Sequence, residues 1–216
     1  MIIYPAPLYQ DVQTLKSIFL SFDAWCQGYH LDYMDGHFVS HRMGSIDLIN
    51  RAQRETKHPL WVHLMAYEPE ALIAQLRLKK NSIVSVHYEA SSGPQLIQQA
   101  KKIAHLNMHP SLAFNPQTDW QDIVNFIPFF DQLLVMGVEP GASGQAFIPK
   151  TISTLQILRD YIDMNGLQCS LVVDGGINEH TLPQIRKSGA TGCALSSSIF
   201  SDEDPLEKFK KLCVIL

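Results

Sequence analysis

The chain has 216 residues, 46% of them hydrophobic and 18% charged, which is long enough to bury a substantial core and excludes a disordered polypeptide. Its net charge is −4 without a block of lysine or arginine, so the charge pattern favours neither a nucleic-acid partner nor a membrane surface. The four cysteines are widely spaced, no apolar run approaches the roughly 20 residues of a membrane span, and no secretory signal is recognisable. These features predict a cytoplasmic protein with reduced thiols.

Strand-like and helix-like segments alternate from the first residues to the last. Amphipathic stripes predict helices such as residues 11–22 and 152–162. Pro69 and Pro94 mark helix starts, and glycines follow other helix ends. The predicted strands cover residues 2–6, 28–34, 60–66, 82–90, 109–115, 132–137, 169–175 and 192–197.

Eight strand–helix units in 216 residues predict an α/β fold, the (β/α)8 TIM barrel, as a single domain over residues 1–216. A doubly wound open sheet is the alternative. It fits less well because Pro5-Ala6-Pro7, rather than a glycine-rich nucleotide-binding loop, follows the first strand. In a barrel, the C-terminal ends of the strands carry the reacting groups.

Three of the predicted strands carry metal-competent side chains near those ends. Alternation along a strand places His30 and Asp32 on one face, while His63 and Asp174 occupy comparable positions on two other strands. Two histidines and two aspartates suit one divalent ion such as Zn, Fe, Mn or Co, and the absence of cysteine from the set disfavours a structural zinc site. We therefore expect these four side chains to converge on a metal at the barrel mouth.

Two further groups of residues accompany these four. Methionines on or beside the same faces predict core filling or an apolar lining against a reaction intermediate; they are Met34, Met65 and Met136. Small residues follow the last three predicted strands, where backbone N–H groups can approach a phosphate closely. They are Gly141, Ser143 and Gly144, then Gly175 and Gly176, then Ser196 and Ser197. Together the three loops predict an anion site.

Several segments match the motifs of one known family. They include His30-Leu31-Asp32-Tyr33-Met34-Asp35-Gly36, Val62-His63-Leu64-Met65, Val86-His87-Tyr88-Glu89-Ala90, Gly144-Gln145-Ala146-Phe147 and Val173-Asp174-Gly175-Gly176-Ile177-Asn178. Through these segments the chain resembles the ribulose-phosphate 3-epimerase family over nearly its whole length. The first and last segments are the most specific.

The resemblance implies a barrel enzyme that interconverts D-ribulose 5-phosphate and D-xylulose 5-phosphate in the pentose phosphate pathway. It also implies a divalent metal held by His30, Asp32, His63 and Asp174, with Asp32 and Asp174 as the acid/base pair. The methionine lining and the phosphate site of the family fall on the residues given above, and His63 is expected to face the substrate as well. The family further implies a homo-oligomer, commonly a dimer or a hexamer.

The chemistry of epimerisation requires such residues independently of the resemblance. Inverting C3 of a ketose removes a proton next to the carbonyl on one face and returns a proton on the other, so two acid/base groups must flank the substrate. Asp32 and Asp174 lie on predicted strands that are far apart around the barrel. A divalent cation stabilises the negative charge that develops on oxygen.

The chain departs from the family pattern at several pocket positions. Ala6 replaces the usual serine after the first strand, and the segment from Ser40 to Arg42 differs from the usual Pro-Asn continuation. Ser196 stands where glycine is usual, and Ala142-Ser143 interrupts the usual Gly-Phe-Gly-Gly run. None of these changes removes a predicted ligand or base, so we expect the substrate pocket rather than the reaction to differ.

Two other functions remain open at this point. The altered pocket is compatible with an epimerase for a six-carbon ketose phosphate such as allulose 6-phosphate. A different class of function is a paralogue that binds a sugar phosphate without turning it over. Retention of all four predicted ligands argues against the paralogue without turnover, and a pentulose 5-phosphate epimerase is the leading prediction.

Overall fold

The computed structural model describes residues 1–215, so the last residue of the predicted 1–216 domain, Leu216, lies outside the described residues. Eight parallel strands form the centre: β1 (Ile2–Pro5), β2 (Tyr29–Asp35), β4 (Leu60–Met65), β5 (Ile83–His87), β6 (His109–Phe114), β7 (Gln132–Met136), β8 (Ser170–Asp174) and β9 (Gly192–Leu195). The short strand β3 (Arg42–Met43) pairs antiparallel with β2.

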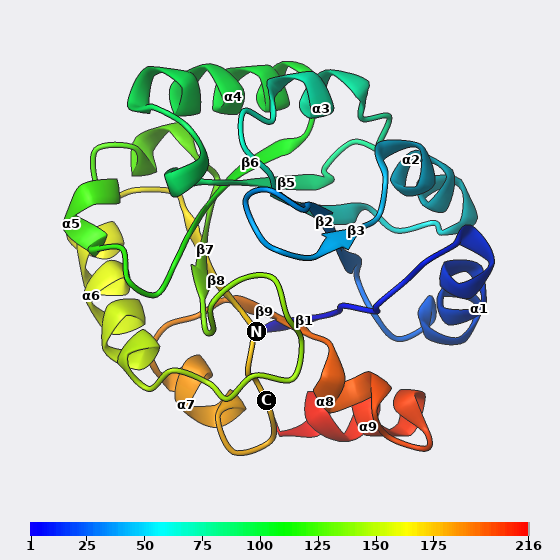
Figure 1. Ribbon diagram of the computed structural model, residues 1–216. Coiled ribbons are helices and arrows are strands. Elements are labelled where there is room, and N and C mark those ends of the chain that lie inside the picture. Colours follow the sequence, from blue (N-terminus) through cyan, green and yellow to red (C-terminus); the bar gives the residue numbers. More distant parts are fainter. Residues whose placement is uncertain (216) are drawn as a thin grey trace.

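The strands form one curled sheet in the order β1-β9-β8-β7-β6-β5-β4-β2-β3. Strands β1 and β2 contact each other across the remaining gap, so the sheet comes round on itself. Figure 1 shows the helices in a ring outside these strands. This arrangement confirms the predicted barrel and excludes the doubly wound open sheet.

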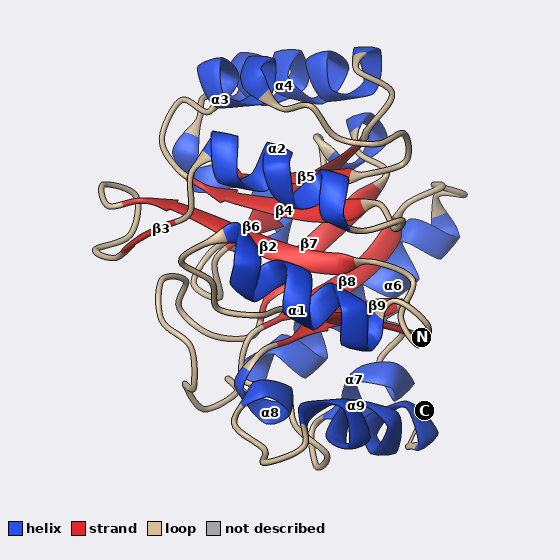
Figure 2. Ribbon diagram, turned by 90° about the vertical axis from the view of Figure 1, so that its right-hand side faces the viewer, coloured by secondary structure: helices blue, strands red, loops and turns tan. Residues whose placement is uncertain are grey.

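Helices follow the parallel strands and cover the outside of the sheet (Figure 2). Several begin at the side chains that the sequence favours for this role: Asp11, Ser45 and Asp204 each accept a hydrogen bond from a backbone N–H in the first turn of the helix that follows. The α-helices are α1 (Val12–Phe22), α2 (Ile46–Glu55), α3 (Glu70–Gln75), α4 (Gly93–His105), α5 (Trp120–Ile123), α6 (Lys150–Met164), α7 (Leu182–Lys187), α8 (Ser197–Phe200) and α9 (Pro205–Val214), with 3-10 turns η1 (Tyr88–Ala90) and η2 (Ile127–Phe129).

Apolar side chains fill two layers. The larger layer lies between the helices and the outer face of the sheet and includes Leu15, Ile49 and Leu155. A smaller cluster fills the barrel interior and includes Trp61, Ala113 and Met136. The barrel is therefore a packed core beneath its mouth, which gives the side chains at the strand ends a rigid support.

A buried polar chain crosses the barrel interior. The indole N–H of Trp61 donates to Ser85 Oγ at 2.8 Å, and the Ser85 hydroxyl donates to Ser111 Oγ at 2.8 Å. The Gln132 side-chain amide donates to the same Ser111 oxygen at 3.1 Å. These bonds pair polar groups that would otherwise be costly to bury and tie β4, β5, β6 and β7 together.

Three segments differ from the sequence prediction. The strand predicted for residues 82–90 ends at His87 and continues as η1, and the strand predicted for 192–197 ends at Leu195, before α8. The hairpin partner β3 was not predicted because two residues are too few to show a period. Among the described residues, no helix is long and apolar enough to cross a membrane.

Candidate active site

Strand register brings the predicted polar residues to one height at the barrel mouth. Asp32 of β2 lies beside His63 of β4, and Met34 lies beside Met65 two residues further along. Across the barrel, Met136 of β7 lies beside Asp174 of β8. Because side chains alternate along each strand, these residues share the interior face of the barrel.

The four predicted ligands form one cluster. His30 Nε2 lies 2.9 Å from Asp32 Oδ1, and His63 Nδ1 lies 3.0 Å from the same oxygen. The two histidine nitrogens lie 3.5 and 3.7 Å from Asp174 Oδ2, respectively. One donor atom from each of the four residues lies within 4.8 Å of every other. The structure thus brings together the whole set that the sequence proposed.

This cluster fits a divalent metal ion. Four ligands at about 2.1 Å from a tetrahedral ion lie roughly 3.4 Å apart, close to the separations observed between the histidine nitrogens and Asp174. The donors are two imidazole nitrogens and two carboxylates, which suit zinc, iron, manganese or cobalt. The structure therefore holds a group that could bind a metal.

The two aspartates have opposite electrostatic environments. Burial favours the neutral form of Asp32, but His30 and His63 outweigh it and hold the pKa of this carboxyl below its usual range. Burial raises the pKa of Asp174, and the charge of Asp32 adds to this effect while both histidines oppose it. The surroundings therefore make Asp32 harder to protonate than a free aspartate and Asp174 easier to protonate.

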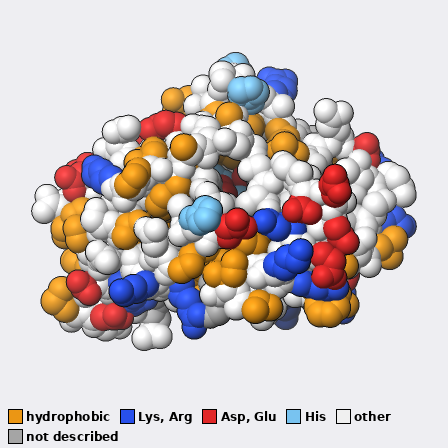
Figure 3. Space-filling model, turned by 90° about the horizontal axis from the view of Figure 1, so that it is seen from below, with side chains coloured by type: hydrophobic (Ala, Val, Ile, Leu, Met, Phe, Trp, Pro, Cys, Tyr) orange, Lys and Arg blue, Asp and Glu red, His pale blue; other side chains and the backbone are white. Residues whose placement is uncertain are grey.

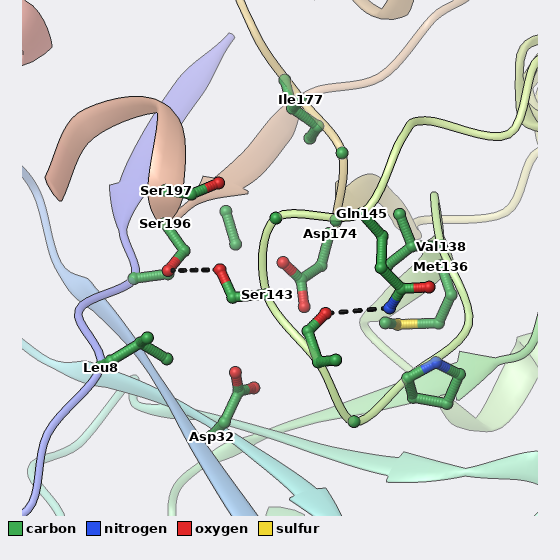
Figure 4. A pocket seen from close by; sticks show the side chains of 18 of the residues that line it. Leu8, Asp32, Met136, Val138, Ser143, Gln145, Asp174, Ile177, Ser196 and Ser197 are labelled. Carbon is green, nitrogen blue, oxygen red and sulfur yellow. Dashed lines mark hydrogen bonds between the residues drawn. The ribbon is translucent and has the colours of Figure 1, made fainter. Parts of the chain in front are cut away.

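A pocket opens directly above this cluster. Figure 4 shows the carboxylates of Asp32 and Asp174 pointing into the same space. The pocket is also lined by the three predicted methionines and by every glycine and serine that the sequence assigned to the anion site: Met34, Met65, Met136, Gly141, Ser143, Gly144, Gly175, Gly176, Ser196 and Ser197. His30 and His63 lie beneath the pocket floor, fully or almost fully buried.

The loops after β7 and β9 meet across the pocket. The Ser143 hydroxyl donates to Ser196 Oγ at 3.5 Å, as the dashed line in Figure 4 shows. The Gln145 side-chain amide donates to the carbonyls of Glu139 and Ala142, which holds the loop after β7 in shape. Backbone and hydroxyl groups therefore face the pocket from two sides.

Two consecutive glycines form the third side of this region. Gly175 and Gly176 have φ values of +97° and +69°, which side chains other than glycine rarely adopt. A Cβ atom on Gly176 would also approach the backbone of Phe147 to 2.6 Å. The loop after β8 therefore requires glycine if it is to pack this closely.

Among the described residues that line this pocket, Asp32 and Asp174 are the ones with an acidic side chain. No lysine or arginine is among the described residues that line it. On the face shown in Figure 3, acidic and basic side chains are interspersed with apolar ones. An anionic substrate group in this pocket would depend on neutral hydrogen-bond donors close to it.

The structure also places residues that were outside the predicted set of site residues. Ala6, the first departure from the family pattern, lines the pocket together with Leu8, Val138 and Ile177. His87 lies against His63, with their Nε2 atoms 2.8 Å apart, and Glu89 lies 3.2 Å beyond it. The signal for this pair was present in the sequence, because His87 and Glu89 repeat at the end of β5 the spacing of His30 and Asp32 on β2.

The geometry defines a class of protein: a (β/α)8 barrel enzyme with a histidine and aspartate cluster beneath a pocket lined by glycine, serine and methionine. The family model described as "Ribulose-phosphate 3 epimerase family" matches residues 3–200. The chain belongs to the ribulose-phosphate 3-epimerase family.

Named relatives agree with this assignment. A ribulose-phosphate 3-epimerase of Synechocystis sp. is 30% identical over 202 residues, covering 93% of this chain and 88% of that protein. A protein of the same name from Chlamydia pneumoniae is 34% identical over 189 residues, covering 86% of this chain and 81% of the relative. The family assignment therefore holds over most of both relatives.

Solved structures support the fold alone. A 3-hexulose-6-phosphate synthase has a TM-score of 0.70 at 12% identity, with both chains covered completely. A thiamine phosphate pyrophosphorylase from Pyrococcus furiosus has a TM-score of 0.64 at 14% identity and covers 99% of this chain and 94% of that one.

Proposed function

We propose that this protein epimerises C3 of a ketose phosphate, converting D-ribulose 5-phosphate to D-xylulose 5-phosphate and back. The observation that carries the proposal is the cluster of His30, Asp32, His63 and Asp174, whose donor atoms lie within 4.8 Å of one another under the pocket. The family assignment and the names of the relatives support this substrate over allulose 6-phosphate and over a protein without turnover.

Asp32 and Asp174 are the proposed acid/base pair. They project from β2 and β8 into one space, so a ketose bound between them can lose its C3 proton to one carboxylate, and the planar intermediate that results can gain a proton on its other face from the second group. The opposite directions of their pKa shifts, lowered for Asp32 by the two histidines and raised for Asp174 by burial, support different roles for the two carboxyls.

His30, Asp32, His63 and Asp174 are also the proposed ligands of one divalent ion per subunit: zinc, iron, manganese or cobalt. When bound, the ion would act as a Lewis acid toward the negative charge that develops on the substrate oxygens. The two histidines are buried beneath the pocket, so their main proposed role is to hold the ion, and His63 would reach the substrate only from below.

The rest of the pocket would bind and shield the sugar phosphate. Met34, Met65 and Met136 offer a lining without hydrogen-bonding groups that could reprotonate the intermediate. We assign the phosphate to the loops after β7, β8 and β9, through Gly141, Ser143, Gly144, Gly175, Gly176, Ser196 and Ser197. Because no cationic side chain lines the described pocket, neutral N–H and O–H donors would make these contacts.

Solvent deuterium incorporation at C3 tests the proposal. The metal-loaded protein in D2O is expected to exchange C3 of ribulose 5-phosphate and to release xylulose 5-phosphate that carries deuterium at C3, and Asp174→Asn is expected to abolish formation of that labelled product. Asp131→Asn is the matched control, because Asp131 pairs with His109 at the opposite end of the barrel and should leave exchange unchanged.

Two outcomes of that test, and one of steady-state kinetics with both sugars, would contradict the proposal. Absence of exchange in the metal-loaded wild type would support a protein that binds without turnover. A higher kcat/KM for allulose 6-phosphate would move the assignment to the hexulose phosphate. Full formation of labelled xylulose 5-phosphate by Asp174→Asn would show that Asp174 is not an essential member of the acid/base pair.

The proposal also covers the assembly, the cellular location and the partners of the enzyme. We propose a single barrel domain that assembles as a homo-oligomer in the cytoplasm, with neither a nucleic-acid nor a membrane partner. The family assignment and the net charge of −4 support this setting. Light scattering of the purified protein would measure the assembly, and a monomeric mass would contradict it.

A further inference from the structure

A buried hydrogen-bonded chain leads from His63 away from the pocket. His63 uses Nδ1 toward Asp32 and Asp174, and its Nε2 lies 2.8 Å from Nε2 of His87. His87 Nδ1 lies 3.2 Å from Glu89 Oε2. Both histidines are completely buried, so water does not compete for these contacts.

The far end of the chain is anchored. Glu89 Oε1 accepts a hydrogen bond from the backbone N–H of Asn115 at 2.7 Å and another from the Thr118 hydroxyl. Both partners lie just after β6. The carboxylate therefore has one oxygen fixed by the neighbouring loop and the other directed at His87.

The orientation of each ring is constrained by packing. The His63 and His87 rings lie 4.9 Å apart and 20° from parallel, and Phe38 packs on His87 with ring centres 4.7 Å apart. A rotated His87 ring would lose the contacts at both of its nitrogens. The packing thus favours the observed ring positions.

A cation at His63 Nδ1 permits only one arrangement of protons along this chain of neutral rings. The lone pair of Nδ1 is then used, so His63 carries its proton on Nε2 and donates to His87. His87 Nε2 must accept, which leaves the His87 proton on Nδ1, where the Glu89 carboxylate accepts it. Every donor in the chain then meets an acceptor.

We propose that His87 and Glu89 are positioning residues that fix the tautomer and the ring orientation of His63 and so present Nδ1 to a metal ion. The inference rests on the proposed metal site. The two histidine ligands differ in how their second ring nitrogen is held: His63 Nε2 contacts His87, whereas His30 Nδ1 has no hydrogen-bond partner among the described residues. His30 is instead held by Trp61, which packs on it at 4.3 Å with the rings nearly perpendicular.

Nitrogen NMR of the wild-type protein loaded with Zn²⁺ tests the proton arrangement without any substitution. The expected pattern is a protonated Nε2 and a metal-bound Nδ1 on His63, with a protonated Nδ1 and an unprotonated Nε2 on His87. A protonated Nε2 on His87 would overturn the inference.

Co²⁺ affinity, measured by competition with a chelator, tests the role itself. We expect His87→Leu to weaken Co²⁺ binding by roughly 10- to 100-fold, the usual effect of losing a partner of a metal ligand. His87→Gln should stay within about threefold of wild type, since its amide can both accept from His63 and donate to Glu89. His109→Leu is the control, because His109 bonds a carboxylate at the opposite end of the barrel.

The outcomes separate this inference from the proposed function. Equal Co²⁺ affinity in wild type and His87→Leu would overturn the positioning role and leave the metal site intact. If His87→Leu does not fold, Glu89→Leu takes its place, because leucine removes the acceptor for His87 Nδ1–H that glutamine would keep. Unchanged Co²⁺ affinity in that variant would overturn the role equally. A wild type that binds no Co²⁺ would overturn both the metal site and the inference.

Discussion

Ala6 is the residue at which the pocket most directly departs from the family. It lines the pocket beside the aspartates and offers no hydroxyl, so the substrate lacks one partner there. Ala6→Ser should restore a hydrogen bond of about 0.5–1.5 kcal/mol, which lowers KM for ribulose 5-phosphate roughly 2- to 10-fold. Steady-state kinetics would measure this change. An unchanged KM would show that the missing hydroxyl does not limit binding.

Another buried alanine provides the control for this substitution. Ala190 is 6% exposed, against 5% for Ala6, and it precedes β9 at the end of the barrel away from the pocket. Ala190→Ser should therefore alter stability without lowering KM.

His87 should make stability depend on pH. Burial lowers its pKa to about 4, with His63 adding to the effect and Glu89 opposing it. Below about pH 6.5 the unfolded chain binds a proton at His87, whereas the folded protein does not bind it until about pH 4. The free energy of unfolding therefore falls as pH drops from about 6.5 to about 4. Above about pH 6.5 the contribution of His87 to that free energy is fully present. The maximum loss is about 3 kcal/mol.

Urea unfolding of the chelator-treated protein at pH 7 and pH 5 measures this contribution. Wild type should lose about 2 kcal/mol more than His87→Gln between the two values, since roughly 1.5 pH units of the window are crossed. The same loss in both proteins would contradict the low pKa of His87.

The individual site residues were largely predictable from the sequence. His30, Asp32, His63 and Asp174 interrupt apolar strands at matching positions, and the structure joins them as expected. The role of His87 was predictable only in part. Its spacing from Glu89 repeats that of His30 and Asp32, but its contact with His63 depends on the relative placement of β4 and β5 and on which ring nitrogen faces inward. Spacing along one strand does not report that placement.

At the scale of elements, the loop after β8 depends on glycine. Gly176→Ala would place a side chain at a φ of +69° and drive its Cβ into the Phe147 backbone. The strained φ alone costs roughly 1–2 kcal/mol, and the clash adds to it. We expect a lower unfolding midpoint in urea and a higher KM, because the displaced loop belongs to the proposed phosphate site.

Gly166→Ala separates backbone strain from the clash. Gly166 has a similar φ of +62° after α6, but a Cβ there would meet no atom within 4 Å among the described residues. The Gly166→Ala variant should be destabilised only by the strained φ, and its KM should be unchanged. Equal destabilisation in the two variants would show that the loop after β8 yields to the added methyl group.

Element boundaries were less predictable than element types. The amphipathic stripe over residues 11–22 corresponds closely to α1 (Val12–Phe22), because Asp11 caps the helix. The strand predicted up to residue 90 stopped at His87, since Glu89 turns to bond the loop after β6. Such a stop is set by a tertiary contact, which local propensity does not report.

At the scale of the whole molecule, the barrel explains why distant segments act together. Eight alternating units predicted the architecture, and closure of the sheet brings β2 and β8 to opposite sides of one mouth. The proposed reaction needs this arrangement, because its two proton transfers occur on opposite faces of the substrate.

The deuterium content of the first product molecules tests this two-base account most directly. The metal-loaded wild type would convert unlabelled ribulose 5-phosphate in D2O, and C3 of the early xylulose 5-phosphate would be analysed by NMR. With Asp32 and Asp174 on opposite faces, the product is expected to carry deuterium at C3, because its proton comes from a second group equilibrated with solvent. Product that retains the substrate's own proton at C3 would contradict the account.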